Sequence, residues 1–395
     1  MSHNIERESL TQEAQVLYDV VSQPSVSGDE RNAAEVFVSH ASALGLDAHI
    51  DEVGNAIALR STLNDTQARA VQIALLGHID TVSGYIRVKT EGGDLYGRGS
   101  VDAKGPLCAM LIAASRAELP DGVDLRVAGA VGEETSGSVG ARHLAPRWSP
   151  DACIIGEPSG FDGVTLGYKG RLLMTARATC PNTHTAGQQR SACDQIHAFW
   201  DTVLERVELF NTDIPRAFDQ IQATLRELAS TSNGLEQHAR LESGFRLPPS
   251  LEPHQLIEML HNLRDAHQDE FPELRIDLTF EGAEAAHATD RSDPVVRAIS
   301  GAIRAQGHRP RPKLKTGTAD LNVVAPIWKC PIAAYGPGDS ALDHTPNEHI
   351  NLEEYQTSIE ILTRAIETLA RELVSQGQDA SAVSGDVSLA RAAGS

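Results

Sequence analysis

The sequence predicts an α/β protein, with a sheet flanked by helices, that is interrupted by a smaller α+β domain. Short apolar runs alternate with helix-like segments in the first and last parts of the chain, which is the pattern of an α/β sheet. From about Val164 the order becomes strand, helix, strand, helix, strand over about 120 residues, enough for a separate domain. The length of 395 residues also favours two domains.

The α/β pattern resumes after the inserted segment, so the larger domain is expected to be discontinuous. It is expected to contain residues 1–165 and 287–374, and the inserted domain residues 166–286. Residues 375–395 are rich in Ser, Ala and Gly and are expected to form a disordered tail.

Local signals predict the individual elements. A helix is expected at 31–44 and ends at Gly45. The turn Ser25–Glu30 precedes this helix and can cap its N-terminus. The run 107–114 is almost entirely apolar, which indicates a helix buried on most sides, with Pro106 in its first turn. The other helices are expected at 10–21, 191–210, 251–263, 294–306 and 352–373. The strands are expected at 47–53, 56–60, 72–77, 123–131, 152–156, 172–179, 274–280 and 331–335, with a further strand end at 242–249.

Composition excludes several classes of function. A formal net charge of −20 argues against binding to nucleic acid, which requires cationic side chains to neutralise phosphates. No apolar run approaches the roughly 20 residues of a membrane helix, and the polar N-terminus does not resemble a signal peptide. We therefore expect a cytoplasmic protein without membrane contact. The five cysteines form no close pair and are interpreted as small buried hydrophobic residues.

Candidate metal ligands follow the expected strands, beginning with the strand at 72–77. His78 and Asp80 lie just after it, and alternate side chains of a strand share a face. They would therefore point the same way from the carboxyl end, where α/β sheets bind ligands. Asp102 stands just before the helix that contains Pro106, either as an outward-facing ligand or only as the N-cap of that helix.

Further carboxylates and a second histidine follow later strands. Glu133 and Glu134 come after the strand at 123–131, and adjacent side chains there point to opposite sides, so one can bind metal while the other accepts a proton. The alternative for this pair is a solvated acidic loop. Glu157 follows the strand at 152–156, and His344 follows the strand at 331–335, either as a nitrogen ligand or as an ordinary loop residue.

Together these strand ends predict a metal centre. Several carboxylates at one edge of one sheet repel one another unless a cation neutralises them. Mixed nitrogen and oxygen ligands suit zinc, with cobalt or manganese as alternatives.

These motifs carry a resemblance to a known family. In this order, His78-x-Asp80, Gly99–Asp102, Gly132–Glu134, Gly156–Pro158 and Asp343-His344 resemble the motifs of the co-catalytic zinc hydrolases of peptidase family M20. The similarity covers essentially residues 10–373. It implies a zinc-peptidase-like catalytic domain with a mixed central sheet, and an inserted lid and dimerisation domain at 166–286.

The resemblance also implies two zinc ions per subunit, with cobalt as an alternative. Asp102 would bridge them, His78 and Glu157 would complete one site, and Glu134 and His344 the other.

The remaining catalytic roles follow from the same resemblance. Asp80 would orient His78, and Glu133 would be the general base. His184 would reach the active site of the partner subunit in a homodimer and polarise the scissile carbonyl. Arg246 best matches the lid arginine that binds a substrate carboxylate.

Two segments indicate which members of the family this chain resembles most. Lys315–Asp320 and Tyr335–Pro346 most resemble the members that release lysine or ornithine from the acidic carrier protein LysW, in lysine and arginine biosynthesis. Acetylornithine deacetylase, succinyl-diaminopimelate desuccinylase and an aminoacyl peptidase of the same family are the alternatives. A catalytically silent dimeric binding protein is a further alternative, but it would have lost Glu133 or a metal ligand, and this chain retains them all.

The substrate contacts are expected in the later loops. A lysine or ornithine ammonium needs a carboxylate partner. Asp320 is the preferred partner of this ammonium because it follows Gly317-Thr318, a loop expected to contact substrate. Asp339 and Asp343 are also candidates, but Asp339 can instead cap a turn and Asp343 can instead orient His344. An acidic carrier also needs a local basic surface on this acidic chain. Six cations are candidates for it, with solvated surface charge as the alternative: Lys169, Arg171, Arg309, Arg311, Lys313 and Lys315.

Overall fold

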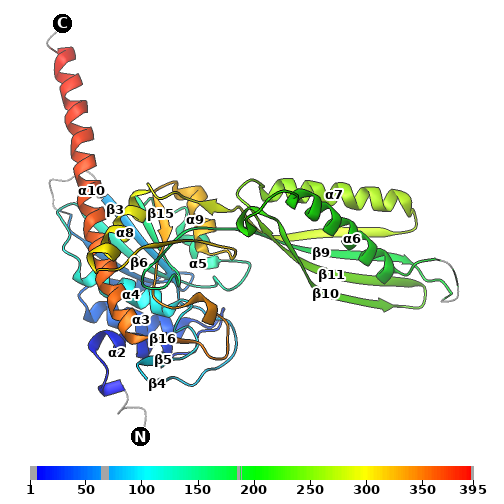
Figure 1. Cartoon of the computed structure of the whole chain (residues 1–395), viewed down its shortest axis with the longest axis horizontal. Coiled ribbons are helices and arrows are strands. Elements are labelled where there is room, and N and C mark those ends of the chain that lie inside the picture. The colour runs from blue at the N-terminus through cyan, green and yellow to red at the C-terminus, as the bar shows by residue number, and fades with distance from the viewer. Residues whose placement is uncertain (1–6, 64–70, 185–186, 188, 393–395) are drawn as a thin grey trace. The chain divides into compact units, whose positions relative to one another are not determined.

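The structure is a computed structural model that describes residues 7–63, 71–184, 187 and 189–392. The chain forms two compact units, which Figure 1 draws with their elements labelled. Unit 1 consists of Met1–Leu166, Thr289–Lys313 and Ala319–Ser395, and unit 2 of Gly167–Ala288 and Leu314–Thr318. Unit 2 thus contains the inserted segment together with Leu314–Thr318, a stretch that lies later in the chain.

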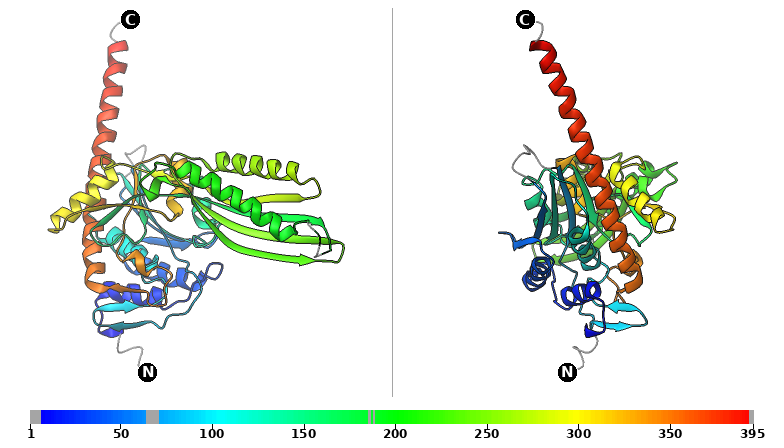
Figure 2. Two further views of the ribbon diagram at one scale, coloured as in Figure 1. Left: turned by 45° about the vertical axis from the view of Figure 1, so that its right-hand side comes forward. Right: turned by 90° about the vertical axis from the view of Figure 1, so that its left-hand side faces the viewer.

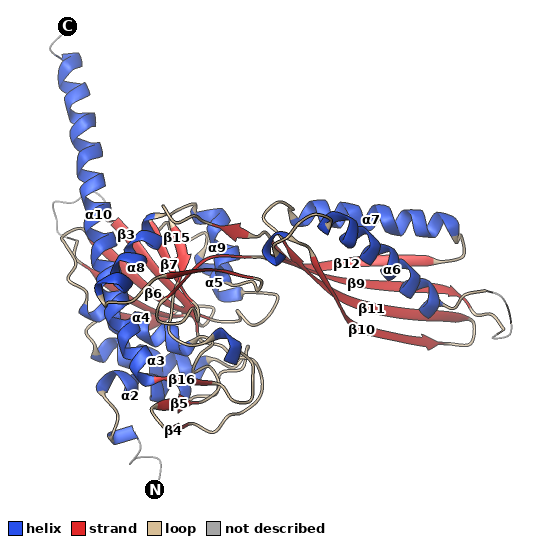
Figure 3. Cartoon of the chain, viewed as in Figure 1, coloured by secondary structure: helices blue, strands red, loops and turns tan. Residues whose placement is uncertain are grey.

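The larger sheet is mixed and runs through most of unit 1. Its strands follow the order β1 (Asp47–Ile50), β2 (Ala56–Ser61), β6 (Val123–Ala130), β3 (Val71–His78), β7 (Ala152–Gly156), β15 (Ile332–Ala334), β8 (Gly163–Tyr168) and β13 (His287–Ala288), and β14 (Arg311–Lys315) pairs with β8. Helices surround these strands (Figure 3). The predicted α/β fold class is confirmed.

The parallel strands of this sheet position the candidate ligands. β6, β3, β7 and β15 are parallel to one another, so their carboxyl ends meet at the same edge of the sheet. β3 ends at His78, β7 ends directly before Glu157, and the loops that follow β6 and β15 contain the other candidates.

The helices of unit 1 form its hydrophobic core together with the strands. They are α2 (Gln12–Val21), α3 (Arg31–Ala43), α4 (Lys104–Arg116), α5 (Val139–Leu144), α8 (Pro294–Ala305), α9 (Asp320–Trp328) and α10 (Leu352–Ala392). Every residue of α4 from Lys104 to Ala114 is buried, as the apolar sequence predicted. α10 packs against α8 and α4, and Figure 2 shows it, orange to red, continuing beyond the sheet.

Unit 2 is an antiparallel sheet with two helices on it. The strand order is β10 (Gln222–Ser232), β11 (Glu236–Leu247), β9 (Gly170–Pro181) and β12 (Arg275–Glu284). α6 (Ala192–Asn211) packs against β9 and β11, and α7 (Pro253–Glu270) against β12 and β9. β9 and β11 alternate buried and partly exposed residues, which is the pattern of strands with one face on a core.

Some elements differ from the prediction. α10 continues to Ala392 and so overlaps the tail expected to be disordered at 375–395, of which residues 393–395 lie outside the described part of the chain. α9 was not expected, since Pro326 lies inside it. A small sheet of β16 (His349–Asn351), β5 (Asp94–Tyr96) and β4 (Lys89–Glu91) is also additional, as is β10 in unit 2. Among the described helices, none is long and apolar enough to cross a membrane.

Candidate metal centre

The first ligand group joins β3, β7 and the start of α4. His78 Nε2 lies 3.2 Å from Asp102 Oδ1 and 3.8 Å from Glu157 Oε1. One donor atom from each of the three residues lies within 4.8 Å of the other two, which is close enough for a shared metal ion. The spacing along the sequence is large, and the parallel strand ends bring these atoms together.

The second ligand group shares Asp102 with the first. His344 Nε2 lies 3.1 Å from Asp102 Oδ2 and 3.0 Å from Glu134 Oε1. The two oxygens of Asp102 therefore face different histidines, which is the arrangement of a carboxylate that bridges two cations. His344 has a φ of 60°, in the left-handed region that non-glycine residues rarely adopt and that is frequent at functional sites.

The charges of these residues fit divalent cations. Burial opposes ionisation of Asp102, but hydrogen bonds from His344 and His78 outweigh burial and hold the pKa of Asp102 well below its usual range. Hydrogen bonds to Asp102 and Glu134 raise the pKa of His344 to about 10. Burial lowers the pKa of His78, but hydrogen bonds to Asp102 and Asp80 raise it further, to well above the usual value. Asp102 is thus held in the ionised form, in which a carboxylate binds a cation.

Asp80 contacts His78 on β3 and also the backbone of Glu133 and Glu134 in the loop after β6. His78 Nδ1 lies 3.0 Å from the backbone oxygen of Asp80 and 3.5 Å from its Oδ1. The Asp80 carboxylate also accepts hydrogen bonds from Ser27 Oγ (2.7 Å) and from the backbone N–H groups of Glu133 (3.1 Å) and Glu134 (3.0 Å). Burial opposes ionisation of this carboxyl group, but these bonds and His78 lower its pKa.

Glu133 is the carboxylate suited to proton transfer. Its side chain belongs to the group formed with His78 and Glu134, whose donor atoms lie within 4.8 Å of one another. Burial, supported by the charges of Glu157, Asp320 and Glu134, raises the pKa of Glu133 well above its usual value. A carboxylate with a raised pKa is a stronger base for water at neutral pH.

Comparison with known proteins decides the family. The sequence description of peptidase family M20/M25/M40 matches residues 74–368. The chain belongs to peptidase family M20. The LysW-lysine hydrolase of Deinococcus radiodurans is 42% identical over 361 residues, with 90% of this chain and 96% of that protein covered. The LysW-lysine/LysW-ornithine hydrolase of Saccharolobus solfataricus is 30% identical, with 93% and 99% covered.

Solved structures of the M20 family share the fold. A tripeptidase from Staphylococcus aureus superposes with a TM-score of 0.73 at 19% identity, covering 91% of this chain and 98% of its own. A dinuclear metal-binding M20 peptidase from Bacillus subtilis superposes with a TM-score of 0.67 at 12% identity, covering 94% and 99%. As an M20 protein with two clustered ligand groups, the chain is a metal-dependent hydrolase.

The sequence analysis did not predict three residues that contact the proposed metal ligands or their neighbours, namely Ser27, Arg98 and Glu348. Ser27 donates to Asp80, as described above. Glu348, which is 1% exposed, accepts hydrogen bonds through Oε1 from the backbone N–H groups of Val101 (3.0 Å) and Asp102 (3.1 Å), and through Oε2 from Arg98 (2.8 Å). Glu348 and Asp102 are 246 positions apart, so spacing along the chain contains no signal of this contact.

The predicted substrate-binding residues of unit 2 form their own contact. Arg246 Nη1 donates to Thr318 Oγ1 (2.6 Å), and Thr318 Oγ1 donates to the backbone oxygen of Lys169 (3.1 Å). A side chain added at Gly317 would meet no atom within 4 Å, so the loop beside Thr318 is open. His184 also belongs to unit 2 and is exposed after the end of β9.

Asp320 begins α9 in unit 1 and is buried, with 3% of its surface exposed. Neither of its carboxylate oxygens meets a hydrogen-bond donor in good geometry among the described residues, although the side chain of Ser138 acts on the carboxyl group and lowers its pKa. Burial, with the nearby charge of Asp80, raises its pKa to about 7, although His78 opposes this. The side chain is thus less accessible than the sequence predicted. Asp339 caps a short 3₁₀ helix, Ser340–Leu342, through a bond from Ala341 N (3.0 Å), so the turn-cap interpretation is confirmed.

Four of the six candidate cations have partners in the structure, whereas Arg309 is exposed. Lys169 is buried and donates to the Ala217 backbone oxygen, Arg171 pairs with Glu284, and Arg311 pairs with Asp162. Lys313 donates to the backbone oxygen of Ser159. The sequence could not predict these partners, because each is brought close only by folding.

Proposed function

We propose that this M20 protein hydrolyses the amide of LysW-lysine, LysW-ornithine or both, and so releases the amino acid from the carrier. The two relatives named above, which match over nearly their whole length, support this substrate. The chemistry rests on one observation, the position of Asp102 between two ligand groups with Glu133 beside them.

We further propose two zinc ions per subunit, with cobalt as a substitute. His78, Asp102 and Glu157 would hold one ion, and Asp102, Glu134 and His344 the other, because each set offers imidazole nitrogen and carboxylate oxygen within one cluster. Such ions would polarise the amide carbonyl and lower the pKa of a water molecule towards neutrality.

The protein's own groups would then move the protons. Glu133 would take a proton from the attacking water and deliver it to the leaving amine, which becomes the α-amino group of the released amino acid. Asp80 would hold the backbone of Glu133 and the ring of His78 in place. The chain needs no serine or cysteine nucleophile for this reaction.

We propose that unit 2 forms a homodimer and brings His184 to the partner subunit's active site. The physical support is strand β10, an edge strand that pairs only with β11 among the described strands and is exposed along nearly its whole length. Leu225 and Leu228 on it are exposed. Long exposed edge strands readily pair with another chain. Arg246 and Thr318 are proposed to contact the substrate beside Gly317.

Asp320 remains the proposed partner of the substrate ammonium. A buried carboxylate that forms no ion pair among the described residues is stabilised by a cationic partner. Asp320→Asn should therefore raise KM for both aminoacylated carriers and leave the metal content unchanged. An unchanged KM for both would exclude this assignment.

A direct test compares four substrates with the purified metal-loaded protein. LysW-γ-lysine, LysW-γ-ornithine, acetylornithine and succinyl-diaminopimelate would be incubated separately, and the released amine measured by chromatography. We expect the highest kcat/KM for a LysW substrate. Preference for either small acylated amine would replace the carrier-protein assignment with that deacylase, while the Glu133→Gln variant controls for a contaminating hydrolase.

A further inference from the structure

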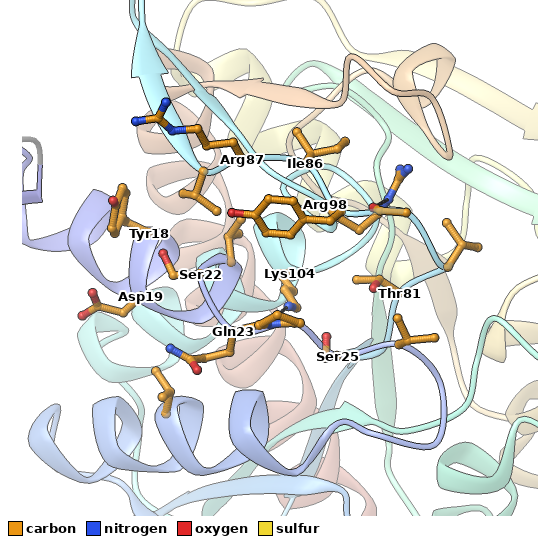
Figure 4. A pocket seen from close by; sticks show the side chains of 18 of the residues that line it. Tyr18, Asp19, Ser22, Gln23, Ser25, Thr81, Ile86, Arg87, Arg98 and Lys104 are labelled. Carbon is orange, nitrogen blue, oxygen red and sulfur yellow. Dashed lines mark hydrogen bonds between the residues drawn. The ribbon is translucent and has the colours of Figure 1, made fainter. Parts of the chain in front are cut away.

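A cavity of about 680 Å³ in unit 1 lies apart from the proposed metal ligands, none of which lines it. Its walls are the C-terminal part of α2, the loop that follows it, α3, and the chain from Thr81 to Val88. Figure 4 shows Lys104 and Arg98 among the side chains that line it. The volume is within the range of pockets for small organic ligands.

The lining is cationic although the whole chain is acidic. Four cationic side chains line the cavity, namely Arg7, Arg87, Arg98 and Lys104, against a single carboxylate, Asp19. Arg7 is neutralised, because it forms two hydrogen bonds of 2.6 Å with Asp19, and Arg98 pairs with Glu348 at 2.8 Å. His40 also contacts Asp19 (3.0 Å). Among the described residues, Lys104 and Arg87 therefore form no ion pair, and the carboxylates of Glu348 and Asp80 act on Lys104 only from beyond 4.0 Å.

Lys104 is the buried charge of the cavity. It is 1% exposed, and its Nζ donates to the backbone oxygens of Val20 (3.2 Å) and Gln23 (2.7 Å). These carbonyls at the end of α2 take two of the three ammonium donors, but they do not neutralise the charge. No carboxylate lies within 4.0 Å of Lys104 in the part of the chain that the structure describes. A buried ammonium without an anion is costly, so the site favours a negatively charged ligand.

Arg87 provides the second charge, at the exposed rim. Across residues 7–63, 71–184, 187 and 189–392, its guanidinium makes no hydrogen bond or ion pair. Between these two cations the lining is apolar, with Val21, Val36 and Ile86 among its residues. A ligand that satisfies the whole lining therefore has an anionic group at each end of an apolar body.

We propose that this cavity binds a small organic dicarboxylate, with one carboxylate group at Lys104, the other at Arg87, and its apolar part against Val36 and Ile86 between them. An Arg guanidinium and a Lys ammonium are the donors that form strong charge-assisted bonds with carboxylates. The site differs from the metal centre in its residues and in its ligand, since it requires no metal.

Calorimetric titration of the full-length, metal-loaded protein tests the site with butanoate, hexanoate and adipate as probes. Hexylamine, with the same apolar body and the opposite charge, is the control ligand. We expect saturable binding of adipate, weaker binding of butanoate and hexanoate, which have only one carboxylate group, and none of hexylamine. Arg87→Ala, a change at an exposed position, should weaken this binding roughly tenfold, the loss expected for one charge-assisted bond. Arg309→Ala removes an exposed arginine outside the cavity and should leave the affinity unchanged.

Two further measurements locate the bound carboxylate in this cavity rather than at the metal centre. Repeating the titration after metal removal with a chelator should preserve binding, because the cavity contains no proposed metal ligand. Lys104→Met should abolish binding, with circular dichroism and Tm showing whether the variant is folded. The proposal is overturned if adipate does not bind, if hexylamine binds equally, if Arg87→Ala retains wild-type affinity, or if binding disappears with the metal.

Discussion

The backbone N–H of Glu133 donates a hydrogen bond of 3.1 Å to the carboxylate of Asp80. The other oxygen of Asp80 accepts from the backbone N–H of Glu134 at 3.0 Å. Because the same carboxylate lies 3.5 Å from His78 Nδ1, it connects one proposed metal ligand with the proposed base. Asp80 therefore holds the two halves of the centre together, beyond the role of orienting His78 that the sequence predicted.

Replacing Asp80 tests this connection. Asp80→Asn keeps the size of the side chain, but its NH₂ group faces a backbone N–H and cannot accept that bond. We expect kcat/KM or metal affinity to fall about 10–100-fold, as for other residues that orient metal ligands. Steady-state kinetics at saturating metal would separate the two effects. Wild-type values for both would show that the geometry does not depend on Asp80.

Glu133→Gln should remove the base and preserve the metal. The amide has nearly the same shape as the carboxylate but cannot accept the proton of water, so kcat should fall by roughly 10²–10⁴. Metal per chain, measured by atomic emission, should remain at the wild-type level. The matched change at the neighbouring position, Glu134→Gln, should instead lower the metal content. Near-normal turnover in Glu133→Gln would exclude Glu133 as the base.

The homodimer can be tested with mixed subunits. If His184 acts in the partner subunit's active site, then inactive Glu133→Gln chains mixed with inactive His184→Ala chains should regain part of the activity. Each such heterodimer contains one complete site. Subunit exchange would be verified with two affinity tags, and each variant alone is the control. No recovery in purified heterodimers would contradict a shared site.

Asp320 should make the stability of the metal-free protein depend on pH. Burial raises its pKa in the folded state to about 7, above the value of an unfolded aspartate. At a pH below the pKa that Asp320 has in the unfolded chain, its carboxyl group is protonated in both the folded and the unfolded state. As the pH rises from there towards 7, only the unfolded chain releases this proton. The free energy of unfolding of the wild type should therefore fall with pH over this interval relative to Asp320→Asn, which cannot ionise.

Urea unfolding of chelator-treated protein at about pH 5 and about pH 8 would measure that difference. A Ser42→Ala variant, changed at an exposed position of α3, is the control for the effect of substitution itself. Parallel pH curves for the wild type and Asp320→Asn would show that Asp320 ionises normally.

The sequence by itself determined which residues are candidates for the metal centre. Buried parallel strands are short apolar runs, and ligands gather at their carboxyl ends, so a His or an acid directly after such a run is readable from the chain. His78 and Glu157 meet this condition within one residue of a strand end. The inserted domain was equally visible, because the periodicity changes where the chain leaves the first sheet.

Only the tertiary structure decided how these residues contact one another. The two oxygens of Asp102 face His78 and His344, and Glu348 holds the backbone of Asp102 from 246 positions away. The predicted cations, such as Arg171 and Arg311, proved to have acidic partners. Helix and strand patterns depend on neighbours a few residues apart, whereas hydrogen-bond partners and burial depend on which distant segments pack together.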